Sequence, residues 1–213
     1  LVIVGGLLDG RKVILAVEPG YRESTESWSA VLRDLKERGL NCPRLVIGDG
    51  NLGIWGALSN VYPDAAEQRC WNHKIVNVLD KLPKSVQPKA KEMLHEIYLA
   101  PSRAEAEKAF DLFLRTYEAK YPKATECLGK DRQELLAFYD FPAEHWMHVR
   151  TTNVIESVFA TVRLRTEKTK GSGTRVACLT MVFKLMQSAS RHWRALNGSA
   201  LLNEVIKGTV FVD

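Results

Sequence analysis

Residues 44–73 read RLVIGDGNLGIWGALSNVYPDAAEQRCWNH, and this stretch decides the fold class. The apolar run Arg44–Gly48 predicts a short strand that ends at Asp49-Gly50. A small helix is expected at about 52–60, and a further short strand at about 65–70. A helix between two strands is the layout of an α/β domain, so we expect that class.

The sequence before this stretch adds two strands and a helix. Two β-rich runs, 1–8 and 12–17, are joined by Asp9-Gly10, a dipeptide typical of hairpin turns. A helix is then expected to begin at Ser24, Ser27 or a neighbour and to end at Gly39. The predicted order is strand, strand, helix, strand, helix, strand.

The sequence from His73 to about Phe141 is expected to contain helices alone. Four groups of apolar residues recur there at helical spacing, and prolines separate them, which predicts faces that pack into a core. The groups are Ile75, Val78, Leu79 and Leu82; Met93, Leu94 and Ile97; Phe110, Phe113, Leu114 and Tyr117; and Leu135, Leu136 and Phe138. A new helix is expected from about Thr152, then a basic, glycine-rich loop at 168–175 and a last helix at about 176–196.

The composition is that of a globular domain. The 213 residues are 46% hydrophobic and 26% charged, which excludes disordered and fibrous classes. No run of about eighteen apolar residues occurs, so we expect no membrane-spanning helix. The four cysteines are scattered without a CxxC pair, which favours a reducing compartment and therefore a cytoplasmic protein. The chain begins with Leu1, from which we expect that it starts inside a longer protein.

The net charge of +5 is concentrated in the last third of the chain. Residues 1–144 carry 20 basic and 21 acidic side chains, a net charge of −1. Residues 145–213 carry 10 basic and 4 acidic side chains, a net charge of +6. This asymmetry predicts an acidic partner, with nucleic acid as the first candidate. A basic solvated surface without a partner is the alternative, and charge alone does not separate the two.

Two carboxylates occupy positions typical of reacting groups. Asp49 follows a strand, where α/β sheets bind ligands, and a carboxylate there can hold a divalent metal. Asp-Gly also forms turns and caps helices, so a structural role is the alternative. Glu156 lies one turn into a helix, in RTTNVIES at 150–157. Its structural alternative is a capping box, with Asn153 as the N-cap residue and Glu156 as the third helical residue.

Other motifs of metal and phosphate chemistry are incomplete. The segment CWNH at 70–73 has half of a zinc spacing, and His145 and His148 are the nearest similar pair. These four side chains could bind zinc, but no CxxC pair supports that interpretation. The segment 48–51 lacks the lysine of a P-loop, and no GxSxG motif occurs.

In their order along the chain, these motifs resemble those of the mutator-type DDE transposases of bacterial insertion sequences. The resemblance rests on Asp49 after a strand, CWNH, a long helical stretch, and then HVRTTNVIES at 148–157 with ATVRLRTEKTKG at 160–171. It covers nearly the whole chain, and RTTNVIES with the basic stretch is its most specific part. Val154 stands where family members often have proline, which leaves this helix start less preorganised.

The resemblance implies an RNase H-like mixed sheet with an all-helical insertion before the helix that carries the final glutamate. Along the chain, the first core part is expected at 1–72 and the insertion at 73–145. The second core part, with basic C-terminal helices, is expected at 146–213.

The resemblance also implies roles for single residues. Asp49 corresponds to the second catalytic carboxylate and Glu156 to the third, and both are expected to bind metal. Cys70 and His73 match the family's C-x2-H motif beside the active site. With Asn153 they are expected to support the site, for example by orienting a carboxylate or a water.

The family's first catalytic aspartate has no counterpart in this sequence. It lies in the middle of the family's first strand, whereas the only acidic residue before Glu18 is Asp9, in the expected hairpin turn. The strands at 1–8 and 12–17 therefore match the family's second and third strands, and the first strand is missing. Because that strand is central in the fold, 1–8 and 44–48 are expected about 9–10 Å apart, twice the usual strand spacing.

The chemistry of DNA cleavage and joining fits the same residues. Two Mg²⁺ or Mn²⁺ ions about 3.5–4 Å apart can activate the attacking group and stabilise the leaving oxygen when carboxylates hold them. Asp49 and Glu156 should therefore approach within about 4–8 Å. Basic residues around Glu156 are expected to hold the phosphates of double-stranded DNA through charge. They are Arg150, Arg163, Arg165, Lys168, Lys170 and Arg175.

Three functions remain open at this point. The first is the catalytic domain of a DDE transposase, truncated at its N-terminus and inactive as given, which acts as a homo-oligomer on transposon ends and target DNA at the bacterial nucleoid. The second is a non-catalytic DNA-binding remnant or regulator derived from a transposase. The third is a structural α/β domain in which Asp49 and Glu156 are caps, and it predicts that their carboxylates lie far apart.

Overall fold

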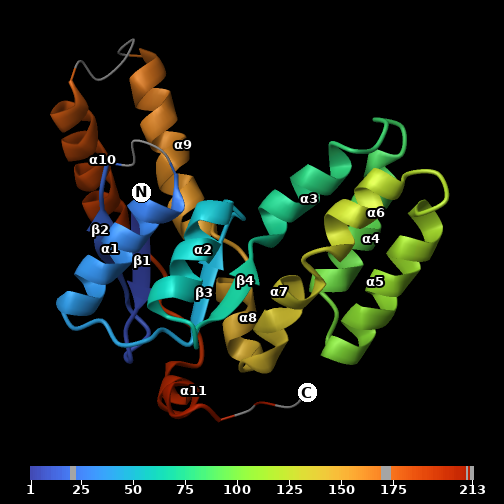
Figure 1. Cartoon of the computed structure of the whole chain (residues 1–213), viewed down its shortest axis with the longest axis horizontal. Helices are drawn as coiled ribbons and strands as arrows, with labels where there is room; N and C mark the ends of the chain where they lie inside the picture. The colour runs from blue at the N-terminus through green and yellow to red at the C-terminus, as the bar shows by residue number, and fades with distance from the viewer. Residues whose placement is uncertain (20–22, 169–173, 210, 212–213) are drawn as a thin grey trace. The chain divides into compact units, whose positions relative to one another are not determined.

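The structure is a computed structural model that describes residues 1–19, 23–168, 174–209 and 211. Strands and helices are mixed up to Arg69, and the described residues from Trp71 onward form helices and connecting segments (Figure 1). The mixed α/β class predicted from the sequence is confirmed. Within the described ranges, no helix is both long and apolar enough to span a membrane.

The chain forms two compact units. The first comprises residues 1–44, 51–65 and 152–208, and the second comprises 45–50, 66–151 and 209–213. The chain therefore passes between the units at 44/45, 50/51, 65/66, 151/152 and 208/209. The predicted division at residues 72 and 145 is a different grouping and stays a prediction.

The first unit is built around an antiparallel hairpin of β1 (Val2–Gly6) and β2 (Lys12–Val17), as predicted. Side chains point to both of its faces, because successive residues of a strand point to opposite sides except where the register shifts, between Ile3 and Val4. Val2, Val4 and Ile14 pack against α9 (Asn153–Lys168) and α10 (Arg175–Ser190). Ile3 and Leu15 pack on the other face, against α1 (Thr25–Glu37). The hairpin thus lies between helices from both ends of the chain.

Helix α1 begins and ends where the sequence predicts. The hydroxyl of Ser24 accepts a hydrogen bond from the Ser27 amide, which satisfies one free donor of the first turn. Gly39 follows the helix with φ 96°, a conformation that glycine adopts without strain. Helix α1 packs against α2 (Leu52–Val61), and Lys36 donates to the carbonyl of Val61 at 3.2 Å.

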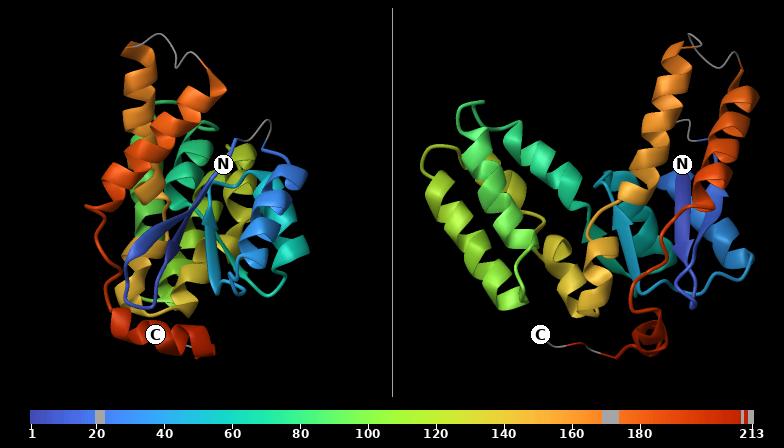
Figure 2. Two further views of the ribbon diagram at one scale, coloured as in Figure 1. Left: turned by 90° about the vertical axis from the view of Figure 1, so that its left-hand side faces the viewer. Right: turned by 180° about the vertical axis from the view of Figure 1, so that it is seen from behind.

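Helices α9 and α10 lie side by side in two views (Figures 1 and 2) and share the buried residues Val158, Val162, Val182 and Met186. The prediction that the last helix runs to 196 is wrong, since α10 ends at Ser190. The amide of Leu196 donates to the carbonyl of Gly10 in the hairpin turn at 2.8 Å. An amide that donates to the hairpin turn cannot donate to the carbonyl four residues before it, as a helix that continued to residue 196 would require. The segment η2 (Ser199–Leu201) and helix α11 (Leu202–Lys207) follow.

The second unit contains a parallel pair of strands, β3 (Leu45–Gly48) and β4 (Ala66–Arg69). Both strands were predicted. Their register pairs Leu45 with Ala66 and Gly48 with Arg69, so the two strands end side by side. In the described part of the chain, β3 and β4 form one ladder and β1 and β2 another. The spacing predicted between 1–8 and 44–48 joins residues of different units and stays a prediction.

The rest of the second unit is a helical segment with one core (Figure 1). Its elements are α3 (Trp71–Leu79), α4 (Gln87–Tyr98), α5 (Arg103–Tyr117), α6 (Pro122–Gly129), α7 (Arg132–Leu136), η1 (Ala137–Asp140) and α8 (Ala143–Val149). All four predicted apolar groups belong to this core, either as buried members or as partly buried residues packed against it. The sequence did not predict α6, whose Leu128 is fully buried there.

The helical segment is attached to β4 through buried polar bonds. The Gln68 side chain accepts from the Phe138 amide at 2.8 Å and donates to the Leu135 carbonyl at 3.2 Å. The Trp71 indole donates to the same carbonyl at 2.8 Å. The Trp71 amide donates to the carbonyl of Arg150 at 3.0 Å, so the end of the helical segment lies next to its beginning.

Candidate functional site

Asp49 lies at the carboxyl end of β3, directly after the buried Gly48. Its side chain is exposed. The adjacent end of β4 continues the ladder by one bond, because the Cys70 amide donates to the Gly48 carbonyl at 2.8 Å. Cys70 therefore lies beside the strand end that carries Asp49. This is the edge of a parallel sheet at which α/β proteins bind ligands.

Cys70 and His73 form a close pair at the start of α3. Cys70 is 1% exposed, and its Sγ lies within 4.8 Å of a ring nitrogen of His73. The first turn of α3 brings the two side chains together, since residues three positions apart share a helix face. His145 and His148 do not join them as a four-ligand zinc set among the residues that the structure describes. His145 is instead buried in α8, at 3% exposure.

Glu156 lies in the first turn of α9 and is held by Thr152. The Thr152 hydroxyl donates to Glu156 Oε1 at 2.6 Å, and the Thr152 carbonyl accepts from the Glu156 amide at 3.2 Å. The capping box proposed from the sequence is wrong in its N-cap residue, because Asn153 is the first helical residue. The hydroxyl fixes the direction of a half-buried carboxylate.

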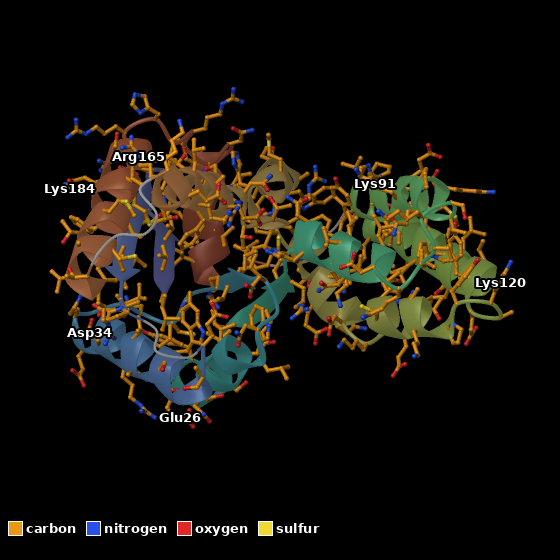
Figure 3. All side chains as sticks on the ribbon, turned by 90° about the horizontal axis from the view of Figure 1, so that it is seen from above. Glu26, Asp34, Lys91, Lys120, Arg165 and Lys184 are labelled. Carbon is orange, nitrogen blue, oxygen red and sulfur yellow. The ribbon has the colours of Figure 1, made fainter. Side chains whose placement is uncertain are left out.

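The basic residues predicted to bind DNA lie on and after α9. Arg163, Arg165 and Lys168 are exposed on α9, and Arg175 is exposed at the start of α10. Lys170 falls outside the described residues. Figure 3 shows Arg165 on α9 and Lys184 on α10 extending outward from this helix pair. Long exposed cations on adjacent helices are suited to contact a phosphate backbone.

Arg150, which was also predicted to bind DNA, is engaged within its own unit. Its guanidinium donates to the Tyr98 carbonyl at 2.6 Å and lies 5.0 Å from the centroid of the Tyr98 ring. Burial lowers the pKa of Arg150 from its ordinary value. A phosphate contact by Arg150 would have to compete with these interactions, and its predicted DNA-binding role stays a prediction.

A group of charged residues on β4 and in the adjoining helical segment was not predicted from the sequence. Arg69, at the end of β4, lies 3.3 Å from Asp131, which also forms an ion pair with the buried Lys74. Burial raises the pKa of Glu67 on β4, and the negative charge of Glu134 raises it further. No local motif indicates such contacts, because they join residues more than fifty positions apart.

The two predicted catalytic carboxylates belong to different compact units, Asp49 to the second and Glu156 to the first. Their predicted approach to within about 4–8 Å, required by a shared metal pair, therefore stays a prediction. The same holds for the metal-binding, supporting and DNA-binding roles of the individual residues.

Comparison with known proteins gives a consistent result over the whole chain. The family described as "Transposase, Mutator family" matches residues 1–195. The chain is 51% identical over 214 residues to the transposase for insertion sequence element IST2 of Acidithiobacillus ferrooxidans, covering 100% of this chain and 72% of that protein. It is 52% identical over 211 residues to the transposase for IS6120 of Mycolicibacterium smegmatis, covering 99% of this chain and 65% of that protein. The transposase for ISRM5 of Rhizobium meliloti is 32% identical over 197 residues, which is 50% of its length.

Proposed function

Since this chain belongs to the Mutator family of transposases, we propose that it is part of a transposase that cleaves and transfers DNA strands at the ends of an insertion sequence. The observation that carries the proposal is the exposed Asp49 at the carboxyl end of a parallel strand, beside Cys70. The chain spans 72% and 65% of two curated relatives, so the activity of a whole transposase is part of the proposal.

In this proposal Asp49 and Glu156 hold Mg²⁺ or Mn²⁺. Their carboxylate oxygens are the ligands that such hard cations prefer. When bound, a pair of these ions supplies activation of the attacking water or 3′-hydroxyl and stabilisation of the leaving oxygen. Thr152 would orient Glu156 through its hydroxyl, as its 2.6 Å bond supports. Cys70, His73 and Asn153 are proposed to support the site.

The substrate in this proposal is double-stranded DNA, at both the insertion-sequence end and the target. Arg163, Arg165, Lys168, Lys170 and Arg175 would neutralise its phosphates. The exposure of the four described members of this set supports the assignment. We infer that the protein works in the bacterial cytoplasm as a homo-oligomer assembled on DNA.

We also propose an RNase H-like core into which the helical segment is inserted. The hydrogen bond between the Trp71 amide and the Arg150 carbonyl supports this arrangement, since it joins the two ends of the segment. The hydrophobic core of the segment also consists of the segment's own residues. Its buried members run from Trp71 to Tyr139, and Trp146 and Val149 pack against them.

The test uses a transposase that contains this chain. Asp49→Asn and Glu156→Gln should each abolish strand transfer and leave DNA affinity within about twofold, because each removes a metal ligand and keeps the side-chain volume. Strand transfer is measured on labelled insertion-sequence ends, and affinity by fluorescence anisotropy. Glu92→Gln, on the exposed surface of α4, is the matched control. Full strand transfer by either active-site variant would reject the catalytic assignment.

The second candidate is a non-catalytic DNA-binding regulator derived from a transposase. It is favoured by the position of Asp9, the only carboxylate in residues 1–17. Asp9 lies in the hairpin turn and forms an ion pair with Arg11 at 2.7 Å. If the protein binds insertion-sequence ends tightly but transfers no strand in Mg²⁺ or Mn²⁺, the regulator is the better description.

A further inference from the structure

The Asp49-Gly50 turn is packed against the side chain of Arg69. Gly50 has φ 98°, and a Cβ built on it would overlap the guanidinium of Arg69. The guanidinium therefore lies directly against the backbone of Gly50, next to Asp49. Gly48 and Arg69 are register partners in the parallel ladder, so the contact follows from the pairing of β3 with β4.

The stability of the fold does not account for an arginine at this position. Arg69 is 9% exposed, and its Nε is buried without a hydrogen-bond partner in the described part of the chain. Its Nη2 lies 3.3 Å from Asp131 Oδ2. A buried guanidinium with an unpaired N–H destabilises a fold relative to an apolar side chain of similar volume.

Asp131, the partner of Arg69, is itself held firmly. Lys74, which is 1% exposed, forms an ion pair with Asp131 and donates to the carbonyl of Cys127 at 2.8 Å. Asp131 directly precedes α7, and the carbonyl of Leu135 in α7 accepts bonds from the side chains of Gln68 on β4 and Trp71 at the start of α3. The carboxylate that binds Arg69 is therefore fixed to the core of the helical segment.

We propose that Arg69 is a positioning residue: its guanidinium holds the Asp49-Gly50 turn in place and links it to Asp131. The inference rests on the proposed function, in which Asp49 binds metal. Arg69 acts through the backbone of Gly50, by limiting the motion of the turn that carries the carboxylate. A metal ligand whose supporting contacts are removed typically loses 10–100-fold in affinity or activity.

The test compares Arg69→Met and Arg69→Lys with Arg132→Met in a transposase that contains this chain. Arg69→Met keeps the length of the stem, and Asp131 keeps its partner Lys74. Arg69→Lys keeps the charge but loses the planar group that covers Gly50. Arg132 is the matched control, because it also pairs with a carboxylate, Asp111, at 2.6 Å, and lies over the ring of Phe110.

We expect Arg69→Met to raise the Mn²⁺ concentration for half-maximal strand transfer about 10–100-fold, with Arg69→Lys in between and Arg132→Met unchanged. Hydrogen–deuterium exchange of residues 48–52 should be faster in Arg69→Met than in the parent protein, and exchange of α5 should be unchanged. The exchange measurement needs neither metal nor DNA. If Arg69→Met does not fold, the same two measurements on Arg69→Lys test the inference.

Two outcomes would overturn the inference: unchanged Mn²⁺ dependence with unchanged exchange at 48–52, or equal losses in Arg69→Met and Arg132→Met. The failure of the proposed function is recognised separately. Strand transfer by Asp49→Asn would reject that function, whereas loss in Asp49→Asn with no effect of Arg69→Met would reject only the role of Arg69.

Discussion

Gly50 is constrained both by its own backbone and by a neighbouring side chain. Its φ of 98° disfavours any other residue, and the guanidinium of Arg69 occupies the space of a Cβ. We expect Gly50→Ala to lower the free energy of unfolding by about 1–3 kcal/mol from backbone strain, and further from the overlap. Urea unfolding measures this. Gly39→Ala is the control, since Gly39 has φ 96° but nothing within 4 Å of its built Cβ. Equal losses in the two variants would show that Arg69 moves aside without cost.

Glu67 should make the stability of the chain depend on pH. Burial, with a contribution from Glu134, raises the pKa of Glu67 in the folded state. Between its unfolded and folded pKa values the folded chain binds more protons, so the free energy of unfolding falls as pH rises through that window. We expect Glu67→Gln to be more stable than the parent at about pH 7 and to match it below the window, as measured by urea unfolding at both pH values.

Asp111 is a control for Glu67, because its pKa is shifted in the opposite direction and its effect on stability should have the opposite dependence on pH. The hydrogen bond from Arg132 lowers the pKa of Asp111, so its contribution is present above the unfolded pKa and is lost as pH falls through the folded pKa. Asp111→Asn should therefore be less stable than the parent at neutral pH. A gain in both variants would indicate a general effect of removing negative charge, not the burial of Glu67.

At the scale of elements, α9 is expected to bind DNA through its exposed cations. Replacing Arg163, Arg165 and Lys168 together by Gln should weaken binding to all sequences and reduce the slope of log Kd against log salt by about 3. Fluorescence anisotropy over a salt series on unrelated duplexes measures both. The same change at Lys91, Lys108 and Lys120, which are exposed on α4 and α5 and beyond α5, is the control. A loss confined to one sequence, with the slope unchanged, would indicate base contacts instead.

The elements that the sequence predicts well are those whose boundaries are set locally. Asp9-Gly10, Ser24 and Gly39 determine a turn, a cap and a stop within a few residues, and the structure has each of them at the predicted place. The predicted end of α10 was wrong: the helix stops at Ser190, and Leu196 instead donates to Gly10, more than 180 positions away in the sequence. Distant contacts of this kind have no local pattern.

The features of the candidate site also divide into those that local sequence patterns predict and those that they do not. The end of β3 places Asp49, and the end of β4 places Cys70, so a reading of strand ends was enough for both. The contact of Arg69 with Gly50 depends on the register of two strands, and the bond from Thr152 to Glu156 depends on the first residue of α9. Hydrophobic patterns locate elements to within a few residues and do not determine either detail.

At the scale of the whole molecule, the helical segment should fold without the rest of the chain. Its buried cluster is drawn from Trp71 to Tyr139, and its ends are joined by the bond between Trp71 and Arg150. We expect a fragment of residues 66–151 to show a helical circular dichroism spectrum and cooperative thermal unfolding. A fragment of residues 1–65 is the contrast, because the hairpin there lacks α9 and α10 on one face. A non-cooperative melt of 66–151 would show that the segment depends on contacts outside it.

The hairpin's position between α1 and α9–α10 also sets an order of events during synthesis. Residues 2–17 leave the ribosome before the helices that cover Val2, Val4 and Ile14, which begin only at Asn153. At a bacterial elongation rate of about 5–20 residues per second, the delay is roughly 7–27 s. Throughout that time an apolar strand face is available to other nascent chains, so the yield of native protein should depend on translation speed and on chaperones that bind extended apolar segments.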